Sequence, residues 1–216
     1  MTIKAVLFDM DGVLIDAKDW HYEALNKALR IFGFEITRFE HLEYYDGLPT
    51  SVKLKMLTKE KGLPQGLHNF INDLKQQYTL DIAYNNCKSR FIHEFALSRL
   101  KNEGYKIAVC SNSIRKSIEM MLERADILKY MDLVVSNQDV TAPKPDPEMY
   151  LVPTKIFGLN PEECLVVEDN EKGIAAAKAA GCHVFIIEKV EEVTYQNIKG
   201  KIREIEQGIS RLEVRQ

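Results

Sequence analysis

The chain has 216 residues, of which 45% are hydrophobic and 28% charged, and its formal net charge at pH 7 is −3. This composition is typical of a globular protein, and the length allows one large domain or a core with a smaller inserted domain. The sequence contains no basic tract or basic-aromatic stripe, which argues against nucleic acid and anionic membranes as partners. The longest apolar runs are far shorter than the roughly 20 residues that a membrane helix needs.

The amino-terminal segment and the cysteines predict a cytoplasmic protein. A carboxylate appears by Asp9, before any apolar stretch long enough for a signal peptide, so we expect no secretory signal. The cysteines form no close pair and no metal-type spacing, and two of them lie in apolar strand-like runs where reduced, buried thiols are expected. The four are Cys87, Cys110, Cys164 and Cys182.

The first expected element is a short buried strand that ends in an acidic turn. The apolar run Ala5–Phe8 is followed directly by Asp9, Met10, Asp11 and Gly12. Such a run predicts a parallel strand that brings two carboxylates to the edge of a sheet. Gly12 allows a tight turn and the close approach of a ligand. Because two carboxylates this close repel each other unless a cation or a shared proton relieves them, we expect them to take part in chemistry.

The next segment, residues 16–82, is expected to form a helical domain inserted into an α/β core. Apolar residues at helical spacing, with Gly33 and Gly62 as stop signals, predict helices rather than strands. The expected helices lie at about 20–32, 51–61 and 67–78. The interval is too long for a simple crossover, so we divide the chain into a core of residues 1–15 and 83–216 and a cap of residues 16–82.

In the rest of the chain, strands and helices are expected to alternate. The expected strands are 106–110, 133–135, 164–167 and 183–187. The expected helices are 91–101, 115–124, 147–157 and 172–180. This alternation predicts an α/β fold with a Rossmann-like parallel sheet and right-handed crossovers. Pro153 lies inside the helix that Asp146 and Pro147 start, and the hydrogen bond it removes costs roughly 3 kcal/mol, so we expect a kink or a short helix there.

Residues suited to phosphoryl transfer follow the strand ends, where parallel sheets bind ligands. Asp9 could attack phosphorus, and Asp11 could protonate the leaving oxygen and then activate water. Asp9 and Asp169 could hold a hard divalent cation, most plausibly Mg²⁺. Ser111 and Lys144 could bind the phosphoryl oxygens. In chain order the strand ends carry Asp9 and Asp11, Ser111 and Asn112, Lys144, then Glu168 and Asp169.

Each of these features also has an ordinary structural explanation. An Asp-x-Asp-Gly segment is often only a turn, and Ser-Asn-Ser after a strand is usually a helix cap. A lysine between two prolines, such as Lys144, is usually solvated, and Glu168 could cap the following helix together with its neighbours. The catalytic interpretation is favoured because four strand ends carry complementary groups together.

Four segments match the motifs of a known superfamily. They are Asp9-Met10-Asp11-Gly12-Val13-Leu14-Ile15-Asp16, Cys110-Ser111-Asn112-Ser113, Ala142-Pro143-Lys144-Pro145-Asp146-Pro147 and Val167-Glu168-Asp169-Asn170-Glu171-Lys172-Gly173. With them, the chain resembles the haloacid-dehalogenase-superfamily phosphohydrolases with a small helical cap, including sugar-phosphate phosphatases and β-phosphoglucomutases. The resemblance covers Ile3 to about Ile187. It implies the strand order 5-4-1-2-3, with strand one at the topological switch point.

The resemblance also implies a role for each motif residue. Asp9 would be the nucleophile and Asp11 the general acid and base. Ser111 and Lys144, with the adjacent Asn112, would hold the phosphoryl group. The implied Mg²⁺ ligands are the carboxylates of Asp9 and Asp169 and the backbone carbonyl of Asp11. Glu168 would lie beside the ion.

The cap is expected to select the substrate. The mutases carry an arginine just after a glycine equivalent to Gly47, and Thr50 stands at that position here, with Lys53 nearby. Losing a bidentate guanidinium at this point is not conservative. His21 matches a cap-hinge histidine of the mutases, and Lys75 is close to one of their cap lysines.

Three functions remain open at this point. The main hypothesis is a Mg²⁺-dependent phosphatase that hydrolyses a small phosphorylated metabolite, such as a sugar phosphate, through an aspartyl-phosphate. Asp11 favours phosphate esters, because the dehalogenases and phosphonatases of the superfamily lack an acid two residues after the nucleophile. The alternatives are a β-phosphoglucomutase-like hexose-phosphate mutase and a non-catalytic domain that binds a phosphorylated ligand or a partner protein.

Overall fold

A five-stranded parallel sheet forms the centre of the computed structural model, which describes residues 2–208. Its strands lie in the order β3-β2-β1-β4-β5, which is the predicted order 5-4-1-2-3 counted from the opposite edge. The central strand places Phe8 beside Val109 on one neighbour and Val167 on the other. The strands are β1 (Ala5–Phe8), β2 (Lys106–Cys110), β3 (Leu133–Val135), β4 (Cys164–Glu168) and β5 (His183–Ile186).

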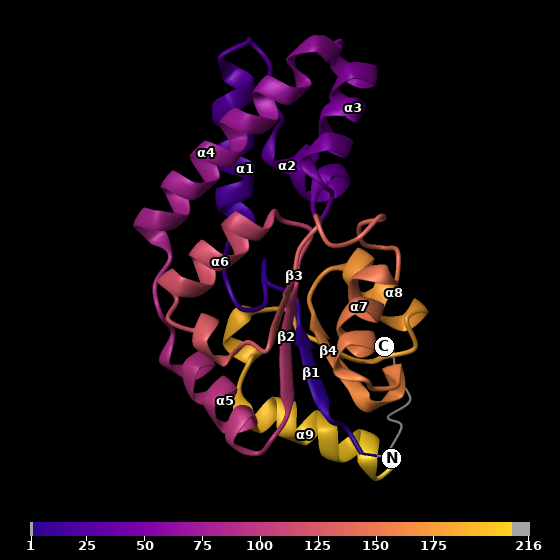
Figure 1. Cartoon of the computed structure of the whole chain (residues 1–216). Coiled ribbons are helices and arrows are strands. Elements are labelled where there is room, and N and C mark those ends of the chain that lie inside the picture. The colour runs from indigo at the N-terminus through magenta and orange to yellow at the C-terminus, as the bar shows by residue number, and fades with distance from the viewer. Residues whose placement is uncertain (1, 209–216) are drawn as a thin grey trace.

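Helices cover both faces of this sheet (Figure 1). Val6 and Phe8 belong to a buried cluster on one face, and Ala5 and Leu7 belong to a second cluster on the other, as the twofold alternation of a strand requires. The first cluster includes residues of α5 (Phe91–Asn102), α6 (Arg115–Arg124) and α9 (Tyr195–Glu206). The second includes residues of α7 (Glu148–Phe157) and α8 (Glu171–Ala179).

A group of helices between β1 and β2 packs around its own hydrophobic cluster, which includes Leu29, Tyr45 and Leu57. It stands above the carboxyl ends of the strands in Figure 1. Its elements are α1 (Lys18–Arg30), α2 (Arg38–Glu40), η1 (His41–Tyr45), α3 (Thr50–Lys61), η2 (Gln65–Leu67) and α4 (His68–Asn86). Elsewhere, short helical turns lie at η3 (Leu128–Tyr130), η4 (Pro161–Glu163) and η5 (Val190–Glu192).

The predicted boundary at residue 82 falls inside α4. This helix continues to Asn86, and its Ala83 packs in a core cluster rather than in the cluster of the cap. The division into residues 1–15, 16–82 and 83–216 stays a prediction, and residues 1 and 209–216 of the predicted core lie outside the described residues.

Most predicted elements agree with the structure, and three further helices are described below. The short helices α2 and η1 and the amphipathic helix α9 were not expected; α9 starts at Thr194, whose hydroxyl accepts a hydrogen bond from the backbone N–H of Asn197. Helix α7 continues through Pro153 to Phe157, so the proline does not end it. The Asp146 carboxylate accepts a hydrogen bond from the backbone N–H of Glu148, as expected for the start of α7.

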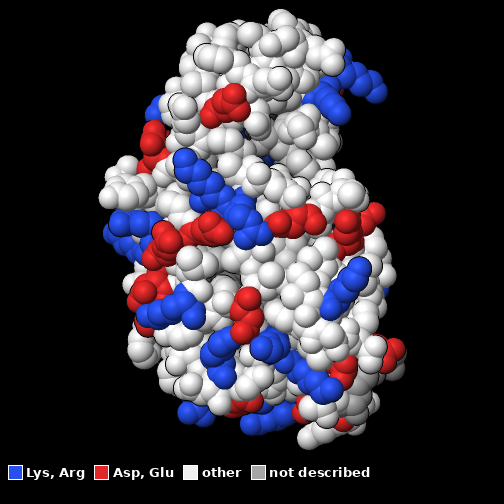
Figure 2. Space-filling view, viewed as in Figure 1, with Lys and Arg blue, Asp and Glu red and all other residues white. Residues whose placement is uncertain are grey.

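Positive and negative side chains are interspersed on the face shown in Figure 2, in line with the small net charge. Among residues 2–208, no helix is both long enough and apolar enough to cross a membrane.

Gly173 lets α8 pack directly against the end of β4. A Cβ atom at this position would lie 1.7 Å from Oε1 of Glu168. The Glu168 carboxylate cannot easily move away, because Lys144, Tyr150 and two backbone N–H groups all donate hydrogen bonds to it. Any residue with a Cβ atom at position 173 would therefore clash with the Glu168 carboxylate.

Replacing this glycine tests the close packing. Gly173→Ala is expected to lower the free energy of unfolding by about 1–3 kcal/mol, because overpacking displaces a buried carboxylate. Gly200→Ala is the control, since Gly200 lies within α9 and has open space around its Cβ position. The control should raise stability by roughly 0.5–1 kcal/mol through helix propensity. Equal stability of the two variants in urea unfolding would contradict the packing argument.

Candidate active site

All the residues predicted at the strand ends except Asp169 line one cavity of about 410 Å³ between the core and the cap. Asp9 directly follows β1, Ser111 follows β2, and Glu168 is the last residue of β4. Lys144, on the loop between β3 and α7, also lines the cavity. The parallel sheet thus brings together groups that lie far apart in the sequence, such as Asp9 and Glu168.

Lys144 is the central cation of this site. Its ammonium group donates hydrogen bonds to Oδ1 of Asp9 at 2.6 Å, Oε1 of Glu168 at 2.7 Å and the carbonyl oxygen of Cys110 at 2.9 Å. The side chain is only 4% exposed. Burial lowers the pKa of Lys144, but the two carboxylates outweigh this effect and hold the pKa above its usual value. Lys144 is therefore a permanent buried cation.

Tyr150 completes the surroundings of this cation. Its hydroxyl donates a hydrogen bond to Oε1 of Glu168 at 2.6 Å, and its ring lies 4.7 Å from the Lys144 ammonium. Both Glu168 oxygens are engaged, since Oε2 accepts hydrogen bonds from the backbone N–H groups of Asp169 and Asn170. Glu168 is thus fixed in place by donors from several elements.

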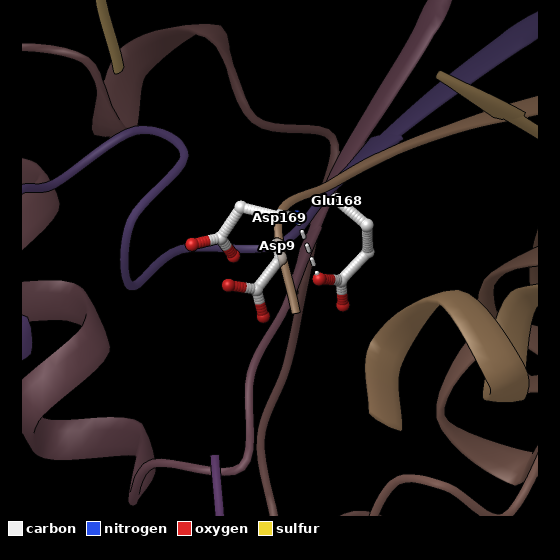
Figure 3. A group of neighbouring side chains, drawn as sticks. All are labelled: Asp9, Glu168 and Asp169. Atoms are coloured by element: carbon white, nitrogen blue, oxygen red, sulfur yellow. Dashed lines mark hydrogen bonds between the residues drawn. The ribbon is translucent and has the colours of Figure 1, made fainter. Parts of the chain in front are cut away.

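Three carboxylates gather within metal-binding reach. Oxygen atoms of Asp9, Glu168 and Asp169 all lie within 4.8 Å of one another (Figure 3). Burial raises the pKa of Asp9 well above its usual value; the Lys144 ammonium opposes this effect and the neighbouring carboxylates add to it. Burial likewise raises the pKa of Asp169. The electrostatics of the cluster therefore favour an added cation.

Asp169 has coordination capacity left over. Its Oδ2 forms an ion pair with the Lys18 ammonium at 2.5 Å, whereas its buried Oδ1 has no hydrogen-bond partner among the described residues. Hard divalent cations prefer such carboxylate oxygens. Asp9 and Asp169 therefore fit a Mg²⁺ site better than Glu168, whose oxygens already accept hydrogen bonds.

Gly12 gives the acidic turn its shape. Its φ angle is +93°, a left-handed conformation that favours glycine. A Cβ atom on Gly12 would lie 2.1 Å from Oδ2 of Asp169. The Asp-x-Asp-Gly segment thus forms a tight turn, and its Gly12 packs directly against the carboxylate of Asp169.

Asp11 lies in a different environment from Asp9. Its Oδ1 is 3.0 Å from Nε2 of His21, and its Oδ2 accepts hydrogen bonds from Ser113 at 3.2 Å and Ser111 at 3.5 Å. Burial raises the pKa of Asp11, but the charges of His21 and Lys75 and the hydrogen bonds outweigh burial and hold the pKa below its usual value. The two aspartates, which have the same side chain, are therefore pushed toward opposite protonation states.

Asn112 links the core to the cap. Its side-chain oxygen accepts a hydrogen bond from the backbone N–H of Lys144 at 3.1 Å, and its amide donates to the carbonyl oxygen of Gly47 at 3.4 Å. A second link runs from the Lys172 ammonium to the carbonyl oxygen of Asp46 at 2.6 Å. These contacts hold the loop before α3 over the site.

The four predicted cap residues, His21, Thr50, Lys53 and Lys75, all line the same cavity. The Lys75 ammonium donates a hydrogen bond to Nδ1 of His21 at 3.2 Å, so these two residues lie beside Asp11. Thr50 begins α3, and Lys53 lies one turn further along that helix.

Sequence reasoning did not identify Lys18, Ser113 or Tyr150 as site residues. Ser113 follows Ser111 by two residues and could have been found from the Ser-Asn-Ser segment. Lys18 and Tyr150 follow no recognisable pattern, because each reaches its partner across the folded structure.

Comparisons with known proteins identify the family of this chain. The family model described as haloacid dehalogenase-like hydrolase matches residues 6–187. A phosphorylated carbohydrates phosphatase from Thermotoga maritima is 30% identical over 202 residues, which cover 92% of this chain and 89% of the relative. A phosphoglycolate phosphatase from Aquifex aeolicus is 28% identical over 180 residues, which cover 83% of this chain and 82% of the relative. The crystal structure of β-phosphoglucomutase from Clostridium difficile has the same fold, with a TM-score of 0.81 at 22% identity over 94% and 98% of the two chains.

The chain belongs to the haloacid dehalogenase-like hydrolase family, since the family model covers most of its length. Together with the phosphatases among its relatives, this membership makes it an enzyme of the phosphoric monoester hydrolase class.

Removing the central cation tests its structural role. Lys144→Met is expected to cost about 3–5 kcal/mol of unfolding free energy, because it leaves the Asp9 and Glu168 carboxylates buried without their partner. Lys101→Met removes a partly exposed lysine paired with Asp132 and should cost far less. Adding Glu168→Gln to Lys144→Met should recover part of the loss in a double-mutant cycle. A Lys144→Met protein as stable as the control would contradict the assigned role.

Proposed function

We propose that this enzyme is a Mg²⁺-dependent phosphatase that hydrolyses a small phosphomonoester through an aspartyl-phosphate on Asp9. The observation that carries this proposal is the pair of aspartates at the end of β1, held in opposite environments. Asp9 contacts the buried Lys144 cation, whereas Asp11 contacts His21 and Ser113. A nucleophile and a proton-transfer group need such different surroundings.

In the first half of the reaction, a carboxylate oxygen of Asp9 attacks phosphorus and the bond to the substrate oxygen breaks. Burial raises the pKa of Asp9 and so disfavours the carboxylate form that can attack, and the Lys144 ammonium opposes this effect. Lys144 and Ser111 lie where they could bind the phosphoryl oxygens, with Asn112 holding the Lys144 backbone.

Asp11 transfers the protons. Its lowered pKa makes it a carboxylate at neutral pH in the described arrangement, ready to accept a proton from the water that attacks the aspartyl-phosphate. To protonate the leaving alkoxide first, Asp11 must bind a proton. A phosphate dianion entering beside it would raise its pKa and favour that step.

Mg²⁺ would be held by Asp9, Asp169 and the backbone carbonyl of Asp11, with Glu168 beside it. When bound, the ion would favour the carboxylate form of Asp9 and neutralise charge on the transferred phosphoryl group. The buried Oδ1 of Asp169, which has no hydrogen-bond donor among residues 2–208, supports this assignment.

The substrate class is a small phosphorylated metabolite, most closely a sugar phosphate. The support is the relative from Thermotoga maritima, whose name specifies phosphorylated carbohydrates, and a cavity of metabolite size. The four cysteines are free and buried, which supports the predicted cytoplasmic location.

The nucleophile assignment is tested by Asp9→Asn with an aryl phosphate and Mg²⁺. An amide cannot act as the nucleophile, so hydrolysis should fall by at least about a thousandfold. Asp16→Asn is the matched control, because Asp16 is an exposed aspartate in the same segment and should leave activity near wild type.

Two outcomes would overturn the proposal. Most activity surviving in Asp9→Asn would contradict the nucleophile. Interconversion of β-glucose 1-phosphate and glucose 6-phosphate faster than phosphate release would instead identify a mutase.

A further inference from the structure

Lys18 is a second cation at the acidic cluster, and a single contact holds it there. Its ammonium lies 2.5 Å from Oδ2 of Asp169, and Lys18 forms no other hydrogen bond or ion pair with residues 2–208. The Lys144 ammonium, in contrast, donates hydrogen bonds to three oxygen atoms, and its side chain is only 4% exposed. The Lys18 side chain is 35% exposed, so its ammonium can exchange Asp169 for water.

The charge of Lys18 does not serve its own helix. Lys18 is the first residue of α1, and Ala17 before it supplies no side-chain cap. A positive charge at this end is unfavourable, because the amino-terminal end of a helix carries the positive end of the helix dipole. The favourable partner of Lys18 therefore lies outside the helix, at Asp169. A residue that breaks a local rule in this way often has a role in the functional site.

Gly12 brings the two partners together. A Cβ atom on Gly12 would lie 2.1 Å from Oδ2 of Asp169 and 2.7 Å from Cε of Lys18. Both side chains thus pack directly over the glycine of the acidic turn. Lys18 also lines the same cavity as Asp9. The ion pair is therefore part of the candidate active site and not a contact of the outer surface.

The Lys18 ammonium contacts a carboxylate that is suited to bind a metal ion. Asp169 lies beside Asp9 and Glu168 in the acidic cluster (Figure 3), and its side chain is only 1% exposed. Burial lowers the pKa of Lys18, but Asp169 outweighs this effect and holds the pKa above its usual value. Lys18 is thus a full positive charge at this carboxylate. A divalent cation that binds there is repelled by it.

We infer that Lys18 is an internal competitor of Mg²⁺ for the Asp169 carboxylate. Its ammonium neutralises the buried carboxylate, and Mg²⁺ binding has to overcome this contact. The enzyme therefore requires a higher Mg²⁺ concentration than its carboxylates alone would need. This inference rests on the proposed function, which assigns the Mg²⁺ site to Asp9 and Asp169.

Calorimetric titration of the enzyme with Mg²⁺ tests this inference without using turnover. Lys18→Met removes the charge and keeps a flexible side chain, so the Kd of Mg²⁺ should fall by about tenfold or more. Lys18→Gln is also neutral and should change the Kd in the same direction. Both variants should fold, because a neutral residue suits the start of a helix better than a cation does. Circular dichroism checks this.

Lys27→Met is the matched control. Lys27 is an exposed lysine of the same helix, and it does not line the cavity. Salt and solvent screen its charge from the acidic cluster, so the Kd of Mg²⁺ should stay within about twofold of the wild-type value.

The results separate this inference from the proposed function. An unchanged or higher Kd in either folded Lys18 variant would overturn the competition, while Asp9-dependent hydrolysis of the aryl phosphate continued. Asp169→Asn removes a charged ligand and should weaken Mg²⁺ binding by at least about tenfold. Mg²⁺ binding that is unaffected by Asp169→Asn would instead overturn the Mg²⁺ site of the proposed function.

Discussion

The buried ammonium group of Lys144 holds the catalytic edge of this enzyme together. It bridges Asp9 after β1 and Glu168 at the end of β4, and its loop is fixed by Asn112 after β2. Without this cation, the sheet would bring several carboxylates into a buried region with nothing to offset their repulsion. Tyr150 and the backbone N–H groups after β4 complete the arrangement by fixing Glu168.

The same cation also makes the environments of the two aspartates different. Asp9 shares Lys144 with Glu168 and lies among carboxylates, whereas Asp11, two residues later, points toward His21 and the serines after β2. Gly12 makes this divergence possible, because its left-handed conformation turns the chain and leaves space for Asp169. One short turn thus places two acids in different electrostatic environments.

The sequence was sufficient to predict the sheet and the groups along its edge. Strands such as Ala5–Phe8 are short apolar runs. In a parallel sheet their carboxyl ends lie at one edge, independently of the conformation of the loops. The end of α4 was not predicted as well, because the helix continues to Asn86 and its Ala83 packs on the core rather than on the cap.

The contacts of Lys18 and Tyr150 were also beyond prediction. Each joins residues far apart in the chain, Lys18 to Asp169 and Tyr150 to Glu168, and depends on packing that no local pattern encodes. The shared position of Lys53 and Lys75 on the cavity has the same origin, since the two lysines come from different helices.

The central claim, a covalent intermediate on Asp9, is tested most directly by acid-quench mass spectrometry of the Asp11→Asn variant. An aryl phosphate has a leaving group that needs little protonation, so Asp9 can still be phosphorylated, while the loss of the Asp11 base slows attack by water. The account predicts one phosphoryl group on the peptide that contains Asp9. A phosphoryl group on another peptide, or phosphate release without any phosphorylated protein, would contradict it.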